Sequence, residues 1–208
     1  MDLYNDININ KQLDYSLMKL YFKMAIALIL LSGTLRGQHS NIGVKGGLNF
    51  YTVNTNNVSN NDVKIGFHLG LINHFHLSPN WAVQPEFVIS TQGTKYSGSD
   101  AKLNLAYINI PVILQYMFDN GFRLQAGPQL GFLVSAKSNV NNNNTDVKDN
   151  MKVIEFGLSV GVGYINTSNG LGIDVRYNRG LTKINKSIPG TSTNAGLQIG
   201  LFYLLNHR

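Results

Sequence analysis

The stretch "FRLQAGPQLGFLVSAK", Phe122–Lys137, alternates between two classes of side chain. Its even positions are all apolar: Phe122, Leu124, Ala126, Pro128, Leu130, Phe132, Val134 and Ala136. Its odd positions are polar or glycine, apart from Leu133. A period of two residues is that of a β-strand, whose side chains point alternately to its two faces. The segment therefore predicts a strand with one apolar and one polar face.

Seven further segments alternate in the same way, and no helical period follows Asn41. They span residues 41–53, 63–77, 81–94, 102–118, 152–166, 170–182 and 193–205, which with 121–137 makes eight strands. Long polar connections at 54–62, 95–100, 138–150 and 183–193 alternate with short turns at 78–80, 119–120 and 167–169. This alternation is typical of outer-membrane barrels. We predict an all-β fold, an eight-stranded antiparallel up-and-down transmembrane β-barrel with both termini in the periplasm.

The N-terminal segment has the order of a secretory signal peptide. A basic segment, 18–23, precedes the apolar run "MAIALILL" (24–31), and small and polar residues, "SGTLRGQ" (32–38), follow it. The run is too short to span a membrane as a helix. We expect residues 1–38 to be an N-terminal extension and signal peptide, with translation starting at Met18, and 39–208 to be the barrel domain. The alternative is a buried N-terminal helix.

Composition excludes several classes of function. The chain has no cysteine, which removes disulfides, thiolate catalysis and zinc–thiolate sites. Its net charge is +6, but the Lys and Arg residues are scattered, which disfavours a nucleic-acid partner. Charged residues make up 13% of the chain, against roughly 25% in a typical soluble domain. No phosphate-binding loop, HExxH or dinucleotide motif is present. We expect no cofactor and no metal.

The position of aromatic residues indicates which face meets lipid. A lipocalin-like soluble barrel, the alternative, would turn its apolar face inward. Here aromatic residues at the apolar positions of the alternation, which we call the apolar or lipid parity, lie beside the short turns, as in the interfacial girdle of a membrane barrel. The predicted periplasmic girdle consists of Phe75, Trp81, Tyr116, Phe118, Phe122, Tyr164 and Tyr203.

The polar parity carries charges of both signs in equal number. They are Lys45, Arg123 and Arg176 against Glu86, Glu155 and Asp174. An eight-stranded barrel is just wide enough for its side chains to fill, and buried charges must be paired. We therefore predict a closed lumen holding an ion-paired network of these six residues. The alternative is that they form a path for protons or ions.

Three prolines interrupt the strands, within "QPEF" (84–87), "YINIPVILQY" (107–116) and "AGPQ" (126–129). Proline has no N–H for a sheet ladder and is normally found at edges or bulges. Because a closed barrel has no free edge, we predict β-bulges at Pro85, Pro111 and Pro128. Pro111 faces the lumen, whereas Pro85 and Pro128 share the lipid parity.

Two constellations of side chains suggest chemistry only weakly. His68, His74 and His76 share the lumen parity, but an H-x-H pair without a third ligand predicts solvated histidines at the barrel mouth. Ser90, His68 and Glu86 offer a nucleophile, a base and an acid, although their spacing does not single them out. An enzyme acting on lipid or peptide is therefore an alternative function.

An ordered set of motifs resembles the PorT-like outer-membrane β-barrel family of the Bacteroidetes. The matching stretches are "GVKGGLNF" (43–50), "WAVQPEFVISTQGTKY" (81–96), "LAYINIPVILQY" (105–116), "LQAGPQLGFLVSAK" (124–137), "FGLSVGVGY" (156–164) and "GIDVRYNRGLTKI" (172–184). One departure is Asn109, where the family usually has a carboxylate. The resemblance implies an integral outer-membrane protein. For such a protein we expect outer-membrane lipid and the barrel assembly machinery as partners. The resemblance implies little about activity, although the founding member is tied to a gliding and secretion system. We favour a non-enzymatic, structural or accessory role, with an envelope or secretion protein as partner.

Overall fold

The structure, a computed structural model, describes residues 40–55, 61–141, 143–186 and 190–205. The predicted signal peptide lies outside these residues. The described part of the chain forms β1 (Ser40–Thr55), β2 (Asn61–His76), β3 (Trp81–Tyr96), β4 (Lys102–Met117), β5 (Phe122–Val140), β6 (Asn143–Asp146), η2 (Lys148–Asn150), β7 (Ile154–Ile165), β8 (Leu171–Gly180) and β9 (Ser192–Leu204). None of its helices is long and apolar enough to cross a membrane.

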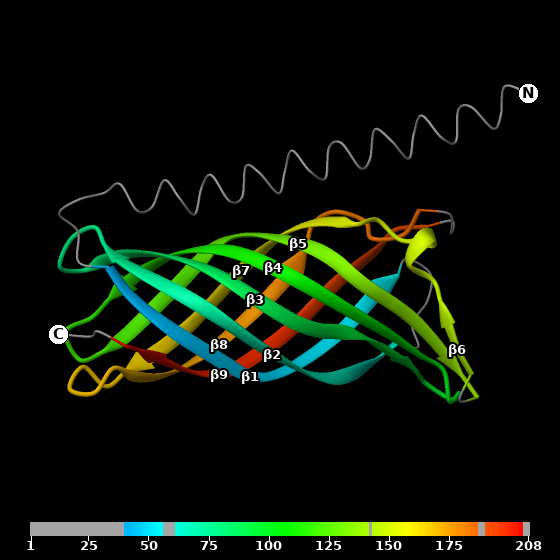
Figure 1. The fold of residues 1–208 in the computed structure, drawn as a ribbon, viewed down its shortest axis with the longest axis horizontal. Helices are drawn as coiled ribbons and strands as arrows, with labels where there is room; N and C mark the ends of the chain where they lie inside the picture. Colours follow the sequence, from blue (N-terminus) through cyan, green and yellow to red (C-terminus); the bar gives the residue numbers. More distant parts are fainter. Residues whose placement is uncertain (1–39, 56–60, 142, 187–189, 206–208) are drawn as a thin grey trace, which may run out of the picture. The chain divides into compact units, whose positions relative to one another are not determined.

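Eight of these strands close into an antiparallel ring. Their order is β4-β3-β2-β1-β9-β8-β7-β5, and pairing of β4 with β5 completes the circle (Figure 1). The first and last strands, β1 and β9, pair continuously from Gly43 with Leu204 to Thr55 with Ser192. Closure gives each strand two neighbours, so no ring strand is left as a free edge. The predicted eight-stranded up-and-down barrel is confirmed.

The two ends of the ring differ in the length of their connections. Short turns join β2 to β3, β4 to β5 and β7 to β8 at one end, which we call the short-turn end. Gly121 and Gly170 adopt φ of +88° and +74° in two of these turns, a conformation that glycine adopts without steric cost. The start of β1 and the end of β9 lie at the same end (Figure 1). We call the opposite end the long-loop end.

One long connection is more structured than the sequence predicts. Residues 138–150 read as a polar loop, but β5 continues to Val140 and pairs with β6 in a hairpin, with Lys137 opposite Asp146. The turn of 3-10 helix η2 follows. The Asn-rich composition hides this hairpin because asparagine is uncommon in strands. Figure 1 shows β6 at the long-loop end of the barrel.

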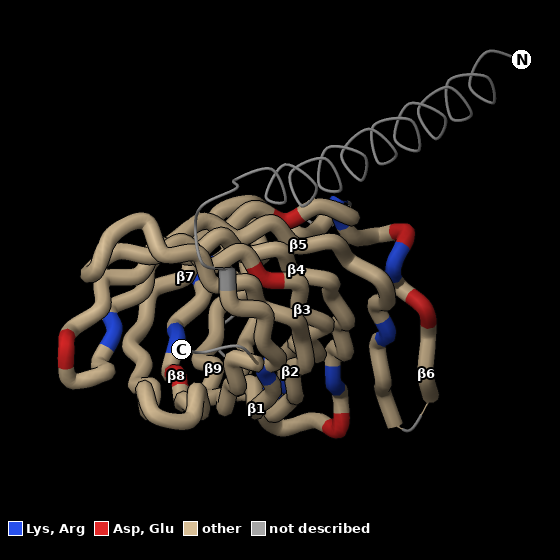
Figure 2. The backbone as a smooth tube through the Cα atoms, turned by 60° about the vertical axis from the view of Figure 1, so that its left-hand side comes forward, with Lys and Arg blue, Asp and Glu red and all other residues tan. Residues whose placement is uncertain are grey.

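The apolar side chains of the ring strands point outward. Ile65, Phe67, Leu69 and Leu201 are 61%, 61%, 65% and 58% exposed, and every ring strand adds large exposed hydrophobic residues. Lys, Arg, Asp and Glu are sparse along the strands and gather toward the loops (Figure 2). A soluble barrel has the opposite arrangement, with its apolar face inside. The lipocalin-like alternative does not fit this outer face.

The three strand prolines do not form the predicted bulges. Each proline lies in a short gap in the pairing between its strand and one neighbour. The gap at Pro85 is between β3 and β2, the gap at Pro111 is between β4 and β3, and the gap at Pro128 is between β5 and β4. The same register resumes beyond each gap, so no extra residue is inserted. A missing N–H removes a ladder hydrogen bond but does not by itself change the register. The bulge prediction for Pro85, Pro111 and Pro128 is therefore wrong.

The register shifts occur nearer the long-loop end. One lies between Val63 and His68 in the β2–β3 pairing, and the other between Ala106 and Tyr107 in the β4–β5 pairing. An extra residue reverses which face the following side chains occupy. Ala136, beyond the second shift, is accordingly buried, although the alternation starting at Phe122 predicts that it points outward.

Candidate functional site: the filled lumen

All six charged residues predicted to line the lumen are buried there. Lys45, Glu86, Arg123, Glu155, Asp174 and Arg176 are each at most 8% exposed. They come from β1, β3, β5, β7 and β8, and each occupies the inward parity of its strand. Sequence parity thus identifies the face correctly. It does not say how far along the barrel axis each charge lies, and the structure separates the six into three groups.

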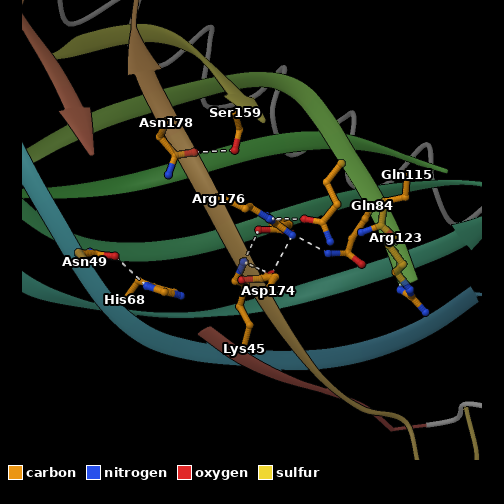
Figure 3. Close-up of polar contacts among 12 residues, drawn as sticks. Lys45, Asn49, His68, Gln84, Gln115, Arg123, Ser159, Asp174, Arg176 and Asn178 are labelled. Carbon is orange, nitrogen blue, oxygen red and sulfur yellow. Dashed lines mark hydrogen bonds and ion pairs between the residues drawn. The ribbon is translucent and has the colours of Figure 1, made fainter. Parts of the chain in front are cut away.

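Four of the six form one compact network. Lys45 Nζ lies 3.3 Å from Glu86 Oε2 and 3.1 Å from Asp174 Oδ2. Arg176 Nη1 lies 2.8 Å from Glu86 Oε1, and its Nη2 lies 3.0 Å from Asp174 Oδ2. Each cation therefore contacts both carboxylates (Figure 3). Two positive and two negative charges balance, as burial in a low-dielectric interior requires.

Amide side chains extend the network. Gln84 Nε2 donates to Glu86 Oε1 over 2.7 Å, and Arg176 Nε donates to Gln125 Oε1. Both glutamines occupy the lumen parity of their strands, which is the signal that would have identified them from the sequence. Hydrogen bonds beyond the ion pairs are needed to offset the cost of removing charges from water. The four charges and two amides together fill the middle of the lumen.

Arg123 and Glu155 lie apart from the network, so the six-member network is corrected to one of four. Arg123, near the short-turn end, donates from Nη1 to Gln115 Oε1 over 3.3 Å, and its guanidinium lies 5.8 Å from the centroid of the Phe202 ring. Glu155, near the long-loop end, accepts from Asn194 Nδ2 over 2.7 Å. Neither enters an ion pair within the described residues.

The three residues of the enzyme alternative do not form a catalytic arrangement. Asn49 lies between Ser90 and His68: its Nδ2 donates to Ser90 Oγ over 3.0 Å, and its Oδ1 lies 2.8 Å from His68 Nδ1. The imidazole is thus engaged with an amide, and Glu86 with Lys45. Ser90 and His68 are 0% and 2% exposed, so the serine has no open approach for a substrate.

Apolar layers close the lumen on both sides of the polar middle. Toward the short-turn end, Ile72, Ile165, Phe202 and Leu204 form a buried cluster. Toward the long-loop end a second cluster comprises Val53, Leu105, Tyr107, Leu133, Ala136, Met151 and Ile184. Met151 and Ile184 belong to the connections that follow β6 and β8.

These two connections hold each other over the mouth of the barrel. Met151 forms an isolated bridge with Asn185, and Lys152 N donates to Ile184 O over 2.7 Å. Asn185 Nδ2 donates to Gly190 O, a hydrogen bond within the connection between β8 and β9. Their hydrogen bonds keep the buried Met151 and Ile184 in the apolar layer. Chain from both connections therefore packs against lumen-facing side chains at the long-loop end.

Aromatic rings pack in a row around the short-turn end. Trp81 meets Tyr116 at 5.1 Å between ring centroids, Tyr116 meets Phe118 at 5.0 Å, and Phe118 meets Phe122 at 5.6 Å. The row crosses from β3 through β4 to β5. Tyr164 and Tyr203 are 50% and 42% exposed farther around the ring.

Phe75 departs from this predicted girdle because it is buried, with 7% exposure. A ring with so little accessible surface contributes little to an interfacial girdle. The histidines nearby also differ from expectation. His74 is fully buried rather than solvated, and its ring lies edge-on to that of His76 at 4.6 Å. Within the described residues no group of three His, Cys, Asp or Glu side chains is placed to hold a metal ion.

Comparison with known proteins identifies the same architecture. A family model described as "Outer membrane protein beta-barrel domain" matches residues 34–186. No curated protein sequence shows significant similarity. Among solved structures, Neisserial surface protein A (NspA) superposes with a TM-score of 0.55 at 13% identity, covering 80% of this chain and 99% of that one. Ail, the attachment invasion locus protein of Yersinia pestis, gives 0.50 at 14% identity, with 79% and 98% covered. At these identities the likeness concerns the fold.

Proposed function

Since the chain belongs to the outer membrane protein β-barrel domain family, we propose that it is a non-enzymatic outer-membrane component whose closed barrel serves a structural or accessory role in the cell envelope. The observation that carries this proposal is the filled lumen. A barrel used for permeation needs an aqueous path, which larger porins provide. Here an ion-paired middle lies between two apolar layers, which favours an anchor over a channel.

The inner residues also favour a non-enzymatic role. The serine and histidine of the enzyme alternative are separated by Asn49, and all three are buried beneath the apolar layer at the long-loop end. Catalysis on lipid or peptide needs a nucleophile that a substrate reaches and a base in contact with it. Loss of lipid or peptide turnover on Ser90→Ala or His68→Ala would overturn this part of the proposal.

We propose that the short-turn end and both termini face the periplasm and that the long-loop end faces outward. Membrane barrels of this class have short periplasmic turns and longer external loops, with aromatic girdles at the interfaces. The aromatic row from Trp81 to Phe122 fits a membrane interface at the short-turn end. Cysteine labelling tests this: a reagent that does not cross membranes should modify Asn144→Cys in intact cells and spare Thr167→Cys.

The partner we infer is a protein of the envelope, including a secretion system as the PorT-like resemblance implies. The β5–β6 hairpin and the connections at the long-loop end supply the surface available for contact outside the membrane. Cross-linking in native membranes followed by affinity isolation tests the role. A stoichiometric envelope partner, recovered besides the assembly machinery, supports it. Recovery of the barrel alone at every cross-linker concentration contradicts it.

Conductance in planar bilayers tests the closed lumen. The purified barrel should give no steady ionic current, while an open porin in the same preparation does. A large and stable conductance would favour the ion-path alternative and overturn the proposal. Fractionation with soluble periplasmic proteins would reject membrane location.

A further inference from the structure

A groove opens on the outer wall of the barrel, outside the filled lumen. It has a volume of about 280 Å³ and crosses four neighbouring strands, β2 to β5. Its lining includes Ile65, Phe67 and Ala106 as apolar walls, and Lys64 and Lys137 as charged ones. Thr91, Asn104 and Ser135 add polar atoms. The combination of apolar wall and cationic rim is that of a surface for an amphiphile.

Both register shifts of the barrel adjoin this groove. The segment between Val63 and His68, where the β2–β3 register changes, supplies four of its lining residues. Ser135 lies at the β4–β5 shift. Bulges bend a strand and re-aim its side chains. Gly66 contributes as well, because a Cβ there would come within 2.3 Å of Thr91 O. The hollow is therefore built into the backbone.

The groove lies where the apolar outer face gives way to charge. Phe67 and Leu69, on the side toward the short-turn end, are 61% and 65% exposed. On the other side stand four lysines on four adjacent strands: Lys64, Lys95, Lys102 and Lys137. Lys95 and Lys102 are register partners, so two cations face each other on β3 and β4. In membrane barrels the edge of the apolar band lies at the membrane interface, the level of the lipid headgroups.

Two carboxylates face these lysines across the sheet, and a third, Asp100, lies two residues before Lys102 in the loop between β3 and β4. Asp62 is the register partner of Lys95, and Asp146 is that of Lys137. The ion pairs of the described residues include none of the four lysines. Lys64 Nζ donates to the neutral Gln92 carbonyl over 2.9 Å. Four positive charges against three negative ones leave a net positive charge that attracts an anion.

We propose that this groove binds the phosphate headgroup of a lipid in the leaflet at the long-loop end. Lys64 and Lys137 would contact the phosphate, while Ile65, Phe67 and Ala106 would pack against the upper part of an acyl chain. The groove thus fits a phosphorylated amphiphile better than a soluble anion, because half of its wall is apolar. The inference requires only membrane insertion, and its failure would leave the proposed envelope role untouched.

Native mass spectrometry of the purified full chain in detergent tests the proposal, with monophosphoryl lipid A as the probe. We expect one lipid to be retained, and a chemically dephosphorylated lipid A to be retained much less. Replacing both Lys64 and Lys137 with Gln should weaken retention about thirtyfold, because each lysine near an anionic headgroup contributes on the order of 1 kcal/mol. The control Lys152→Gln/Lys183→Gln removes the same charge from exposed residues outside the groove, and should change retention by less than about twofold.

Equal retention of the phosphorylated and dephosphorylated lipids would overturn the proposal, as would equal losses in the two double variants. Displacement of the lipid by millimolar inorganic phosphate would also overturn it, by showing a site for free phosphate. Heat-modifiable migration on gels confirms that both double variants are folded before binding is compared.

Discussion

Glu86 and Arg176 face each other across the full diameter of the barrel. In the ring order β4-β3-β2-β1-β9-β8-β7-β5, the strand β3 lies opposite β8, at equal distance in both directions around the circle. Yet Glu86 Oε1 and Arg176 Nη1 are 2.8 Å apart, and their burial excludes water from most of the contact. This ion pair connects opposite walls of the barrel, a connection that we call a brace. Lys45 contacts Glu86, and Asp174 contacts Arg176.

Removing one partner of this brace should destabilise the barrel strongly. Glu86→Ala leaves Lys45 and Arg176 sharing one carboxylate, and an uncompensated buried charge typically costs about 3–5 kcal/mol. Urea unfolding in lipid vesicles, followed by the fluorescence of the single tryptophan, Trp81, measures the loss. The exposed Asp100→Ala serves as control, with an expected change within about 0.5 kcal/mol. Similar small effects in both variants would mean that the lumen is wet at this level.

Replacing the whole network should cost less than breaking it. In the quadruple variant Lys45→Met, Glu86→Leu, Asp174→Leu and Arg176→Met, no charge is left without a partner. Buried ion pairs exchanged for apolar residues of similar volume are often neutral or stabilising. We expect the same urea titration to place this variant above Glu86→Ala in stability. A lower value than that of Glu86→Ala would show that the four charges stabilise the barrel beyond mutual compensation.

A charge on the outer face should cost more at mid-height than at the end of the barrel. Val160 is 51% exposed near the middle of β7, and Leu77 is 51% exposed in a short turn. Val160→Arg should lower the free energy of unfolding by about 2–4 kcal/mol and Leu77→Arg by about 0–1 kcal/mol, because the cost of an arginine depends on its depth in the bilayer. Folding titrations into vesicles measure both. Equal penalties at the two positions would contradict the assignment of this face to lipid.

Glycines on the lumen face keep space for large rings. A Cβ at Gly196 would lie 2.4 Å from Tyr51 Cγ, so Gly196→Ala forces the buried tyrosine to move. Overpacking of this kind costs about 1–3 kcal/mol. Gly46, which faces outward on the adjacent strand β1, is the control, since a Cβ there would be 3.4 Å from the nearest atom, an ordinary contact. Unfolding midpoints compare the two alanine variants, and equal shifts would refute the packing argument.

Alternation in the sequence predicts which face a residue occupies far better than where it lies along the barrel. All six lumen charges could be assigned because each strand keeps its parity over the relevant segment. The separation of Arg123 and Glu155 from the other four charges could not be predicted. The position of a residue along the barrel axis depends on the stagger between strands, which no single strand encodes. Ala136 shows a second limit: one inserted residue on β5 reverses the faces beyond it.

Three structural features depend on tertiary contacts that the composition of their own segments does not indicate. The hairpin of β5 and β6 lies in a segment whose asparagines favour loops. Phe75 follows the alternation of an outward residue but is buried. The groove at Lys64 and Lys137 was not predicted at all, because its lining comes from four strands brought together by two register shifts.

The central ion pairs also constrain the order in which the barrel is made. Except for the contact of Arg176 with Asp174 on the same strand, they connect strands that are not neighbours: β1 with β3, β1 with β8 and β3 with β8. A growing sheet of hairpins therefore cannot form the pairs that reach β8 until the last strands arrive. Until then its inner face must stay hydrated. Neutralisation of all four charges is therefore complete only in the closed ring, because Lys45–Asp174 and Glu86–Arg176 both join an early strand to β8. The seam between β1 and β9 closes that ring.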